Sequence, residues 1–370
     1  MILTAAALLL FLLYSGLLLY YRKWWSRVKD APASSSPPQL KLSVIIPARN
    51  EGENIGRILN ALQEQLYPKE LYEVLVVDDH STDGTTSIVM QETGNVKLVS
   101  LAPDKVGKKK AIEAGVANAT GEWIITTDAD CIPGPHWLHM ITSFAAANDS
   151  VFIAAPVQYE HNGSLLETFQ TLDFMTLQGI TAASVASGFH SMCNGANLAY
   201  KKEAFEEVAG FEGIDKLASG DDLLLMHKIW TKHPQQVHYL KAPEAIVLTK
   251  PMPTWKQFFS QRIRWASKTT YYEDKRIFWS LVLVYFFNVV FIVLALAGFW
   301  NHYYWQAALA LLLLKTLVEL TFLIPVARFF KQQKLLWLFP LCQPLHILYT
   351  VTIGLISQFG SYQWKGRTTK

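Results

Sequence analysis

Hydrophobic positions are distributed unevenly along the chain, and their pattern separates a central segment from two apolar ends. No charged side chain occurs between Ile2 and Tyr21, and three further apolar stretches lie at residues 277–300, 303–327 and 335–360. A run of about 20 apolar residues is long enough to cross a bilayer as a helix. The pattern therefore predicts a transmembrane anchor at residues 1–21 and about three transmembrane helices in the C-terminal part.

The last of these stretches is less uniform than the others. Its first half contains Pro340, Gln343, Pro344 and His346, and prolines and polar side chains interrupt a lipid-facing helix. Two structures are therefore open for residues 335–360, a transmembrane helix or a broken re-entrant hairpin.

Between the apolar ends, continuous hydrophobic runs alternate with amphipathic stretches. Strands are predicted at LSVIIP, YEVLVVDD, VKLVSL and EWIITTDAD, which begin at Leu42, Tyr72, Val96 and Glu122, and helices at residues 54–65, 82–92 and 108–119. Apolar strands that alternate with helices are typical of a parallel sheet buried on both faces. Residues 41–250 are therefore predicted to form an α/β domain with a Rossmann-like, mostly parallel sheet.

Basic residues next to the apolar stretches predict how the chain is oriented. Basic side chains follow the first stretch within residues 22–29, and Lys275 and Arg276 precede the second. Positive charge stays preferentially on the cytoplasmic side of a membrane, whereas a signal peptide carries it before the apolar run. We therefore expect an uncleaved anchor, a basic flank and linker at residues 22–40, and a cytoplasmic segment at residues 22–276.

Composition agrees with a multi-pass protein of the cell membrane. The 370 residues are 51% hydrophobic and only 17% charged, with a mean hydropathy of +0.17, which excludes disorder and an ordinary soluble enzyme. A net charge of +3 is too small to indicate nucleic-acid binding. Cys131, Cys193 and Cys342 lie far apart without a CxxC spacing, so neither a disulfide framework nor a zinc site is predicted.

Two pairs of acidic residues stand at the ends of predicted strands. Asp78 and Asp79 end the second strand, and Asp128 and Asp130 end the fourth. We expect these strands to be neighbours, with both pairs at the edge where parallel sheets bind ligands. The carboxylates of Asp128 and Asp130 would share one side of an extended segment and suit Mg²⁺ or Mn²⁺ bound with a diphosphate. The alternative is that these aspartates only cap turns.

A third acidic pair, Asp221 and Asp222, precedes an amphipathic helical stretch. Adjacent carboxylates in different environments leave one of them suited to act as a general base. Acidic residues are also favoured in the first turn of a helix by its dipole, which is the structural alternative.

Residues 251–276 combine aromatic and basic side chains, as in a helix at a membrane surface. Within them, Arg264 is a candidate to neutralise a departing diphosphate, and Trp265 to form an apolar platform under a sugar. Arg262 and Lys268 are expected on a solvated basic face that contacts anionic lipid.

Together these residues spell a series of motifs. In order, they are IIPARNE, VVDDHSTDG, GKKKAI, TTDAD, CNGANLAYKKEAF, GDD and QRIRW. The series, followed by membrane helices, resembles the membrane-bound inverting glycosyltransferases of family two. These are GT-A enzymes that include cellulose, hyaluronan and ceramide glucosyl synthases. The resemblance covers about residues 41–270.

The resemblance implies roles for individual residues. It places Pro47, Arg49, Asn50 and Glu51 along the nucleotide, Asp79 with Asp78 at the uracil, and Lys108 near the diphosphate. Asp128 and Asp130 form the D-x-D, with Asp130 as the direct metal ligand. Asp222, with Asp221 beside it, is the catalytic base, and Gln261, Arg264 and Trp265 belong to the QxxRW. It also implies a divalent metal, Mg²⁺ or Mn²⁺, and a nucleotide sugar that is UDP-linked.

The implied reaction is a single in-line displacement by an acceptor hydroxyl. Because QRIRW directly precedes the first C-terminal apolar stretch, we expect a lipid or lipid-linked acceptor at the membrane surface. A processive polysaccharide synthase is the first alternative, and a non-catalytic nucleotide-binding membrane scaffold is the second. The basic tail at residues 361–370 is expected on the cytoplasmic side, and a partner subunit is left open.

Overall fold

The computed structural model describes residues 2–28, 30, 39–161, 163–189, 192–214, 220–267, 274–357, 362–364 and 367–369. The chain divides into two compact units. The sheet unit comprises Val28–Glu160 and Ser191–Lys250, and the helical unit comprises Met1–Arg27, His161–His190 and Pro251–Lys370. Most of the predicted linker, residues 31–38, lies outside the described residues, as does much of the predicted basic tail.

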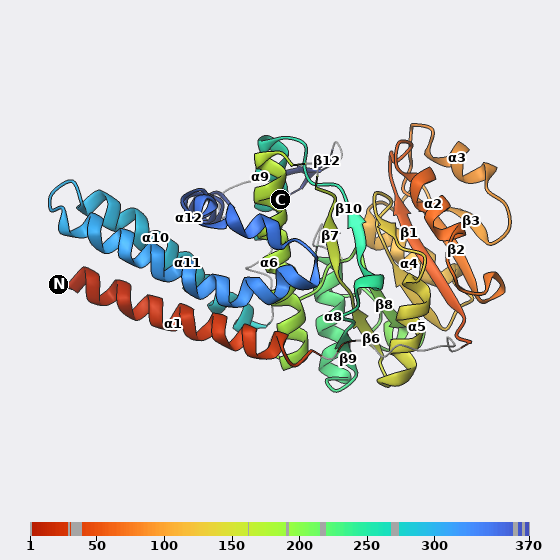
Figure 1. Ribbon diagram of the computed structural model, residues 1–370. Coiled ribbons are helices and arrows are strands. Elements are labelled where there is room, and N and C mark those ends of the chain that lie inside the picture. The colour runs from red at the N-terminus through yellow and green to blue at the C-terminus, as the bar shows by residue number, and fades with distance from the viewer. Residues whose placement is uncertain are drawn as a thin grey trace. The chain divides into compact units, whose positions relative to one another are not determined.

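The sheet unit contains a seven-stranded, mostly parallel sheet (Figure 1). Its order is β3-β2-β1-β4-β8-β6-β9, and only β8 runs antiparallel to its two neighbours. The strands are β1 Leu42–Ala48, β2 Tyr72–Asp78, β3 Val96–Ser100, β4 Trp123–Thr126, β6 Phe152–Ala154, β8 Leu198–Lys201 and β9 Val237–Tyr239. A smaller sheet contains β5 Ile132–Pro133, β10 Val247–Thr249 and β7 Val157–Tyr159. The four predicted strands and the predicted fold class are confirmed.

Helices cover the large sheet because its central strands are apolar on both faces. Every residue of β2 is buried, and so is every residue of β1 except Pro47. The helices of this unit are α2 Ile55–Gln63, α3 Thr85–Gln91, α4 Lys108–Asn118, α5 Trp137–Ala147, α7 Lys202–Glu207 and α8 Asp221–Lys232, with short 3-10 turns at Lys69–Leu71 and Pro243–Ala245. Helix α4 lies directly on β1, since a Cβ on Gly115 would come within 2.5 Å of the Ile45 side chain. The tight packing holds α4 against β1.

The prediction that the two acidic strand ends are neighbours is wrong. Strand β1 lies between β2 and β4 and pairs in parallel with both of them. The chain builds β1, β2 and β3 outward in one direction and then crosses back to place β4 on the other side of β1. This reversal is a topological switch point, where α/β sheets form a crevice at their carboxyl edge. The two acidic clusters therefore lie on either side of β1, about 10 Å apart by the usual strand spacing.

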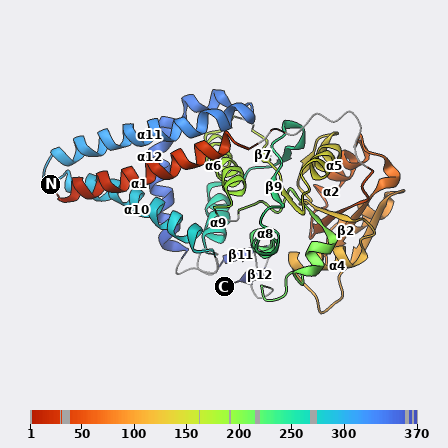
Figure 2. The same cartoon turned by 90° about the horizontal axis from the view of Figure 1, so that it is seen from below.

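The helical unit contains the four apolar stretches. Its helices are α1 Ile2–Trp25, α6 Leu165–Ser187, α9 Trp255–Ala266, α10 Lys275–Ala297, α11 Tyr303–Phe329 and α12 Phe339–Ile356, followed by the β11 Tyr362–Trp364 and β12 Arg367–Thr369 hairpin. Helices α1, α10, α11 and α12 are long and apolar enough to cross a membrane (Figures 1 and 2). The third C-terminal stretch forms a 3-10 turn, Gln333–Trp337, and then one helix that continues through Pro344. No hairpin occurs among its described residues, 335–357.

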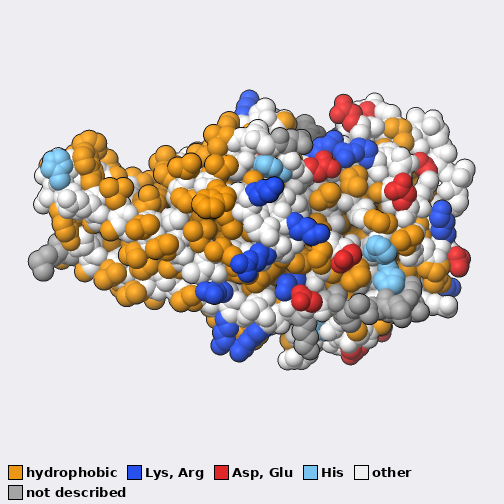
Figure 3. Space-filling view, viewed as in Figure 1, with side chains coloured by type: hydrophobic (Ala, Val, Ile, Leu, Met, Phe, Trp, Pro, Cys, Tyr) orange, Lys and Arg blue, Asp and Glu red, His pale blue; other side chains and the backbone are white. Residues whose placement is uncertain are grey.

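Large hydrophobic side chains remain exposed on these helices. Figure 3 shows such side chains dominating the drawn face of the helical unit. They include Leu8, Leu9, Leu12, Leu309 and Leu313, each more than half exposed. An apolar surface of this extent calls for an apolar environment such as lipid.

Helix α6 was not predicted, and it interrupts the predicted domain at residues 41–250. It packs against α1 and α11 in the helical unit. Ser164 caps its start, where its hydroxyl accepts a hydrogen bond from the Glu167 amide at 3.1 Å, and Gly188 ends it in the left-handed conformation. A Cβ on Gly179 would come within 2.7 Å of Val326, so this glycine lets α6 and α11 approach closely.

Lys315 and Glu319, one turn apart on α11, form an ion pair inside the helical unit. Their charged atoms are 2.6 Å apart, and the Lys315 side chain is only 1% exposed. Gln343 of α12 hydrogen-bonds both of them, and the Tyr14 hydroxyl of α1 donates to Glu319. The network therefore connects three of the four long apolar helices through polar contacts.

Removing one charge of this network is expected to destabilise the protein more than removing both. Lys315→Met leaves the Glu319 carboxylate buried without its cation, which costs about 3–5 kcal/mol in typical buried pairs. Lys315→Met combined with Glu319→Gln removes both charges and should be closer to wild type. Thermal unfolding of the detergent-solubilised protein would measure the relative stability of wild type, the single variant and the double variant. A single variant as stable as the double variant would contradict a structural role for the pair.

Candidate active site

Two loops after β1 and β2 are bonded to each other. The Arg49 guanidinium donates to the Asp79 carbonyl oxygen at 2.7 Å and lies 3.8 Å from the Asp79 carboxylate. The Asn50 amide donates to the Ser81 hydroxyl at 2.9 Å, and the Thr82 amide donates to the Asn50 side-chain oxygen at 2.8 Å. These contacts bring together Arg49, Asn50 and Asp79, three of the residues that the resemblance places along the nucleotide.

The remaining predicted nucleotide residues lie in the same two segments. Pro47 is part of β1, and the Glu51 amide donates to the Thr85 hydroxyl at 2.8 Å. Asp78 ends β2 and accepts the Ser81 amide at 3.2 Å, which is the turn-capping contact considered as its alternative role. Of these three residues, Asp78 therefore has an evident structural function.

Asp79 also determines how the chain enters α4. Its carboxylate accepts the Gly107 amide at 3.0 Å, and Gly107 adopts a left-handed φ of 97° that favours glycine. The next residue, Lys108, begins α4. Through Gly107 and Lys108, the loops that hold Asp79 are thus connected to the acidic cluster on the far side of β1.

Lys108 is the centre of that second cluster. Its ammonium nitrogen donates to Asp128 Oδ1 at 2.5 Å and lies 4.0 Å from Asp221 Oδ2. Burial alone would lower the pKa of Lys108, but the nearby carboxylates of Asp128, Asp221 and Asp222 outweigh burial and raise it. Lys108 is therefore a permanent cation among three acids.

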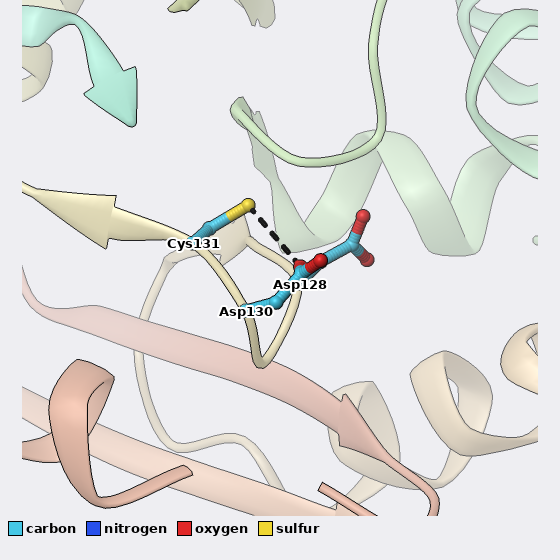
Figure 4. Close-up of side chains that lie close together, drawn as sticks. All are labelled: Asp128, Asp130 and Cys131. Atoms are coloured by element: carbon cyan, nitrogen blue, oxygen red, sulfur yellow. Dashed lines mark hydrogen bonds between the residues drawn. The ribbon is translucent and has the colours of Figure 1, made fainter. Parts of the chain in front are cut away.

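Asp130 follows β4 in the chain and lies beside Asp128 (Figure 4). Burial, followed by the negative charges of Asp128 and Glu51, raises the pKa of Asp130 to about 6. The Cys131 thiol, whose pKa burial also raises, donates to Asp130 Oδ1 at 3.7 Å. One ligand atom from each of Asp128, Asp130 and Cys131 lies within 4.8 Å of the others. The raised pKa of Asp130 indicates that neighbouring positive charge does not balance these carboxylates. Their oxygen atoms are hard ligands, which suit a cation such as Mg²⁺ or Mn²⁺.

Asp222 is oriented by two backbone amides. Gly220, at a φ of 86°, precedes α8, so that Asp221 and Asp222 fall in the first turn of the helix. Asp222 Oδ2 accepts the Gly195 amide at 2.8 Å, and Oδ1 accepts the Leu223 amide at 2.8 Å. A carboxylate held by two donors has a fixed direction, which a general base requires.

Gly195 is a site residue that reasoning from the sequence missed. A Cβ at this position would lie 3.2 Å from the Lys108 nitrogen and 3.4 Å from Asp222 Oδ2. In the sequence, Gly195 was marked by its position in the CNGAN motif. A glycine has no side chain whose chemistry could have indicated a role. Its backbone amide and its lack of a side chain together bring Asp222 close to Lys108.

Gln261, Arg264 and Trp265 lie on α9 in the helical unit. All three are half-buried, and the Trp265 ring is 6.2 Å from the Phe174 ring of α6. The acids described above belong to the sheet unit. That these three residues meet the acids at one reaction centre therefore stays a prediction.

The expectation that Arg262 lies on a solvated face is wrong. Its side chain is 2% exposed, lies 2.7 Å from Asp173 Oδ2 of α6, and stacks 4.2 Å above the Trp265 ring. Asp173 was missed because it is a single acid in a mostly apolar stretch, although a lone charge there indicates a buried partner. Lys268, expected on the same face, lies outside the described residues.

Comparison with known proteins gives a family match and distant relatives. Residues 43–209 match the family described as Glycosyl transferase family 2. The glycosyltransferase AglE of Haloferax volcanii is 33% identical over 203 residues, covering 54% of this chain and 62% of that protein. Poly-beta-1,6-N-acetyl-D-glucosamine synthase of Staphylococcus epidermidis is 24% identical over 229 residues, 61% of this chain and 53% of that protein. The matched region thus spans less than two thirds of either relative.

Among solved structures, the mannosyltransferase PcManGT of Pyrobaculum calidifontis, determined with GDP-Man and Mn²⁺, has a similar fold. Its TM-score is 0.61 at 22% sequence identity, and the match covers 93% of this chain and 99% of that chain. This likeness supports the fold of the sheet unit.

Proposed function

We propose that this chain is a glycosyltransferase of family 2, since residues 43–209 match that family, and that it transfers a sugar from a nucleotide-diphosphate donor with inversion at the anomeric carbon. The observation that carries the proposal is the cluster of Lys108, Asp128, Asp221 and Asp222. Turn capping explains single aspartates, but it does not explain why acids from two segments converge on one half-buried lysine. Such convergence is typical of a site that binds a charged ligand.

In the proposed reaction, Asp222 accepts the proton of an acceptor hydroxyl. The hydroxyl oxygen forms a bond to the anomeric carbon while the bond from that carbon to the diphosphate breaks, and the nucleoside diphosphate leaves. Asp128 and Asp130 would hold a divalent ion, which supplies positive charge for the leaving group. Arg264 is proposed to add bidentate hydrogen bonds, and Trp265 an apolar surface beside the sugar.

The donor is proposed to be UDP-linked, as the resemblance implies for Asp79. The carboxylate of Asp79 is buried, and one of its oxygens is held by the Gly107 amide, so the residue has a fixed position. Titrations of the purified protein with UDP and with GDP in Mn²⁺ would test the assignment. If GDP bound more tightly than UDP, the donor would instead be assigned as GDP-linked.

The acceptor is proposed to be a lipid or lipid-linked hydroxyl. A polymer would need a polar path through the long helices, and Gln343 and Asn288, two of their polar side chains, form hydrogen bonds inside the helical unit. Gln343 bonds to Lys315 and Glu319, and the Asn288 amide donates to the Val284 carbonyl at 2.7 Å. A headgroup at the membrane surface needs no such path.

A processive polysaccharide synthase is the second candidate, favoured by the relative from Staphylococcus epidermidis. The test is to incubate the purified protein with radiolabelled nucleotide sugars and extracted membrane lipids, and to examine the products by mass spectrometry. Single-sugar lipid products support the proposal. A ladder of long saccharides would establish the second candidate, and no turnover with any donor would indicate a non-catalytic scaffold.

The protein is proposed to lie in the cell membrane with the sheet unit in the cytoplasm. The support is the length and composition of α1, α10, α11 and α12, together with basic residues beside α1 and α10. A cysteine introduced at exposed Asn301, with the native cysteines replaced by alanine, should be labelled by an impermeant reagent from outside the cell. A cysteine at exposed Glu53 should stay unlabelled, and the reverse pattern would invert the topology.

A further inference from the structure

Lys108 occupies a position that an inorganic cation would also favour. Its ammonium bonds to Asp128 Oδ1 at 2.5 Å and lies 4.0 Å from Asp221 Oδ2. Asp128 contributes one of the three ligand atoms that lie within 4.8 Å of one another. The same carboxylate therefore belongs both to an ion pair of the protein and to the candidate metal site.

These two uses of Asp128 oppose each other. A divalent ion beside Asp128 and Asp130 would lie near the Lys108 ammonium, and like charges at such distances repel strongly in a partly buried site. The lysine side chain is a compact charge on a flexible stem, so it is able to move. The entry of a metal thus requires Lys108 to leave Asp128 or to remain close at an electrostatic cost.

The surroundings limit where Lys108 can go. On one side lies Gly195, where an added Cβ would already be 3.2 Å from the Lys108 nitrogen. Asp222 is held in place there by the Gly195 amide. The side chain of Lys108 is 24% exposed, so its open side faces solvent. A diphosphate entering from that side would offer the ammonium a new anionic partner in exchange for Asp128.

We propose that Lys108 is a built-in competitor for the metal site, which holds Asp128 until a divalent ion and a nucleoside diphosphate bind together. This inference rests on the proposed function, since it concerns the order in which that site is filled. Lys108 keeps metal affinity low in the absence of donor and releases Asp128 when the diphosphate provides a counter-ion. Metal and nucleotide binding are thereby coupled, and coupling of this kind is reciprocal.

The test measures Mn²⁺ binding by electron paramagnetic resonance on the purified, full-length protein, without nucleotide and with saturating UDP. Lys108→Gln removes the competing charge and should tighten Mn²⁺ binding without nucleotide at least about tenfold, equivalent to about 1.4 kcal/mol. The gain in Mn²⁺ affinity on adding UDP should shrink in the same variant. Lys108→Arg keeps the charge and should bind Mn²⁺ weakly without nucleotide.

The matched control is Lys110→Gln on the same helix. Lys110 pairs with Glu113 at 2.8 Å, and this variant removes an equal charge two positions further along α4. It should change Mn²⁺ affinity less than twofold. The inference fails if Lys108→Gln binds Mn²⁺ no more tightly than wild type, or if Lys110→Gln tightens binding equally. If wild type bound no Mn²⁺ even with UDP or GDP, the proposed metal role would fail first, and the inference with it.

Discussion

Asp222→Asn is expected to lower turnover at least about 100-fold while nucleotide affinity stays near that of wild type. The amide cannot accept the proton of the acceptor hydroxyl, but it keeps the shape of the carboxylate and one oxygen for the Gly195 or Leu223 amide. Transfer of radiolabelled sugar would report the rate, and calorimetry would report nucleotide binding.

Asp104→Asn is the control for this prediction. Asp104 is an exposed acid in the loop before α4, so its loss alters the net charge equally and should leave turnover unchanged. Near-normal turnover by Asp222→Asn would remove Asp222 from the mechanism. Asp221 would then be the next candidate, since its carboxylate also faces the Lys108 ammonium.

Asp130→Ala is expected to abolish metal-dependent nucleotide binding. The variant removes a carboxylate whose pKa is raised to about 6 by burial and by its acidic neighbours, which are conditions that a bound cation relieves. Nucleotide affinity in excess Mn²⁺ should fall to the affinity measured in a chelator. An unchanged UDP affinity would contradict the metal role.

The same pKa predicts how the wild-type protein responds to acid. Because a proton and a metal ion compete for the Asp130 carboxylate, Mn²⁺ binding at limiting metal and saturating UDP should be stronger at pH 7 and weaken as the pH falls below about 6. Asp104→Ala should retain this pH dependence, since Asp104 lies outside the acidic cluster. A flat profile between pH 7 and pH 5 would show that Asp130 does not bind the ion.

The strands and the candidate acids were predictable because local patterns determine them. Leu42–Ala48 and Tyr72–Asp78 are mostly apolar runs, Asp78 and Asp79 stand at the end of the second run, and Asp128 lies two residues beyond β4. What the sequence could not provide was the placement of β1 between the acidic clusters, since strand order depends on a crossover between distant segments. The predicted neighbourhood of β2 and β4 was wrong for this reason.

Residues whose roles depend on long-range partners were also misread or missed. Arginine is usually a surface residue, and the burial of Arg262 depends on contacts such as its ion pair with Asp173, 89 positions earlier. Gly195 contributes an amide and an absent side chain, and neither leaves a chemical signature in a sequence. The role of such positions follows from packing, which a residue pattern does not record.

Helix α6 has a consequence for how the protein is made. It lies in the chain between β7 and β8, yet it packs against α1 and α11, and α11 ends about 140 residues later. At common translation rates, roughly 5–20 residues per second, α6 waits about 7–30 s after its own synthesis before α11 is complete. During that interval Gly179 and its neighbours lack the surface formed by Phe322 and Val326. Newly made chains should therefore be open to chaperones or proteases at α6, and the sheet unit cannot be excised as one continuous fragment without carrying that helix.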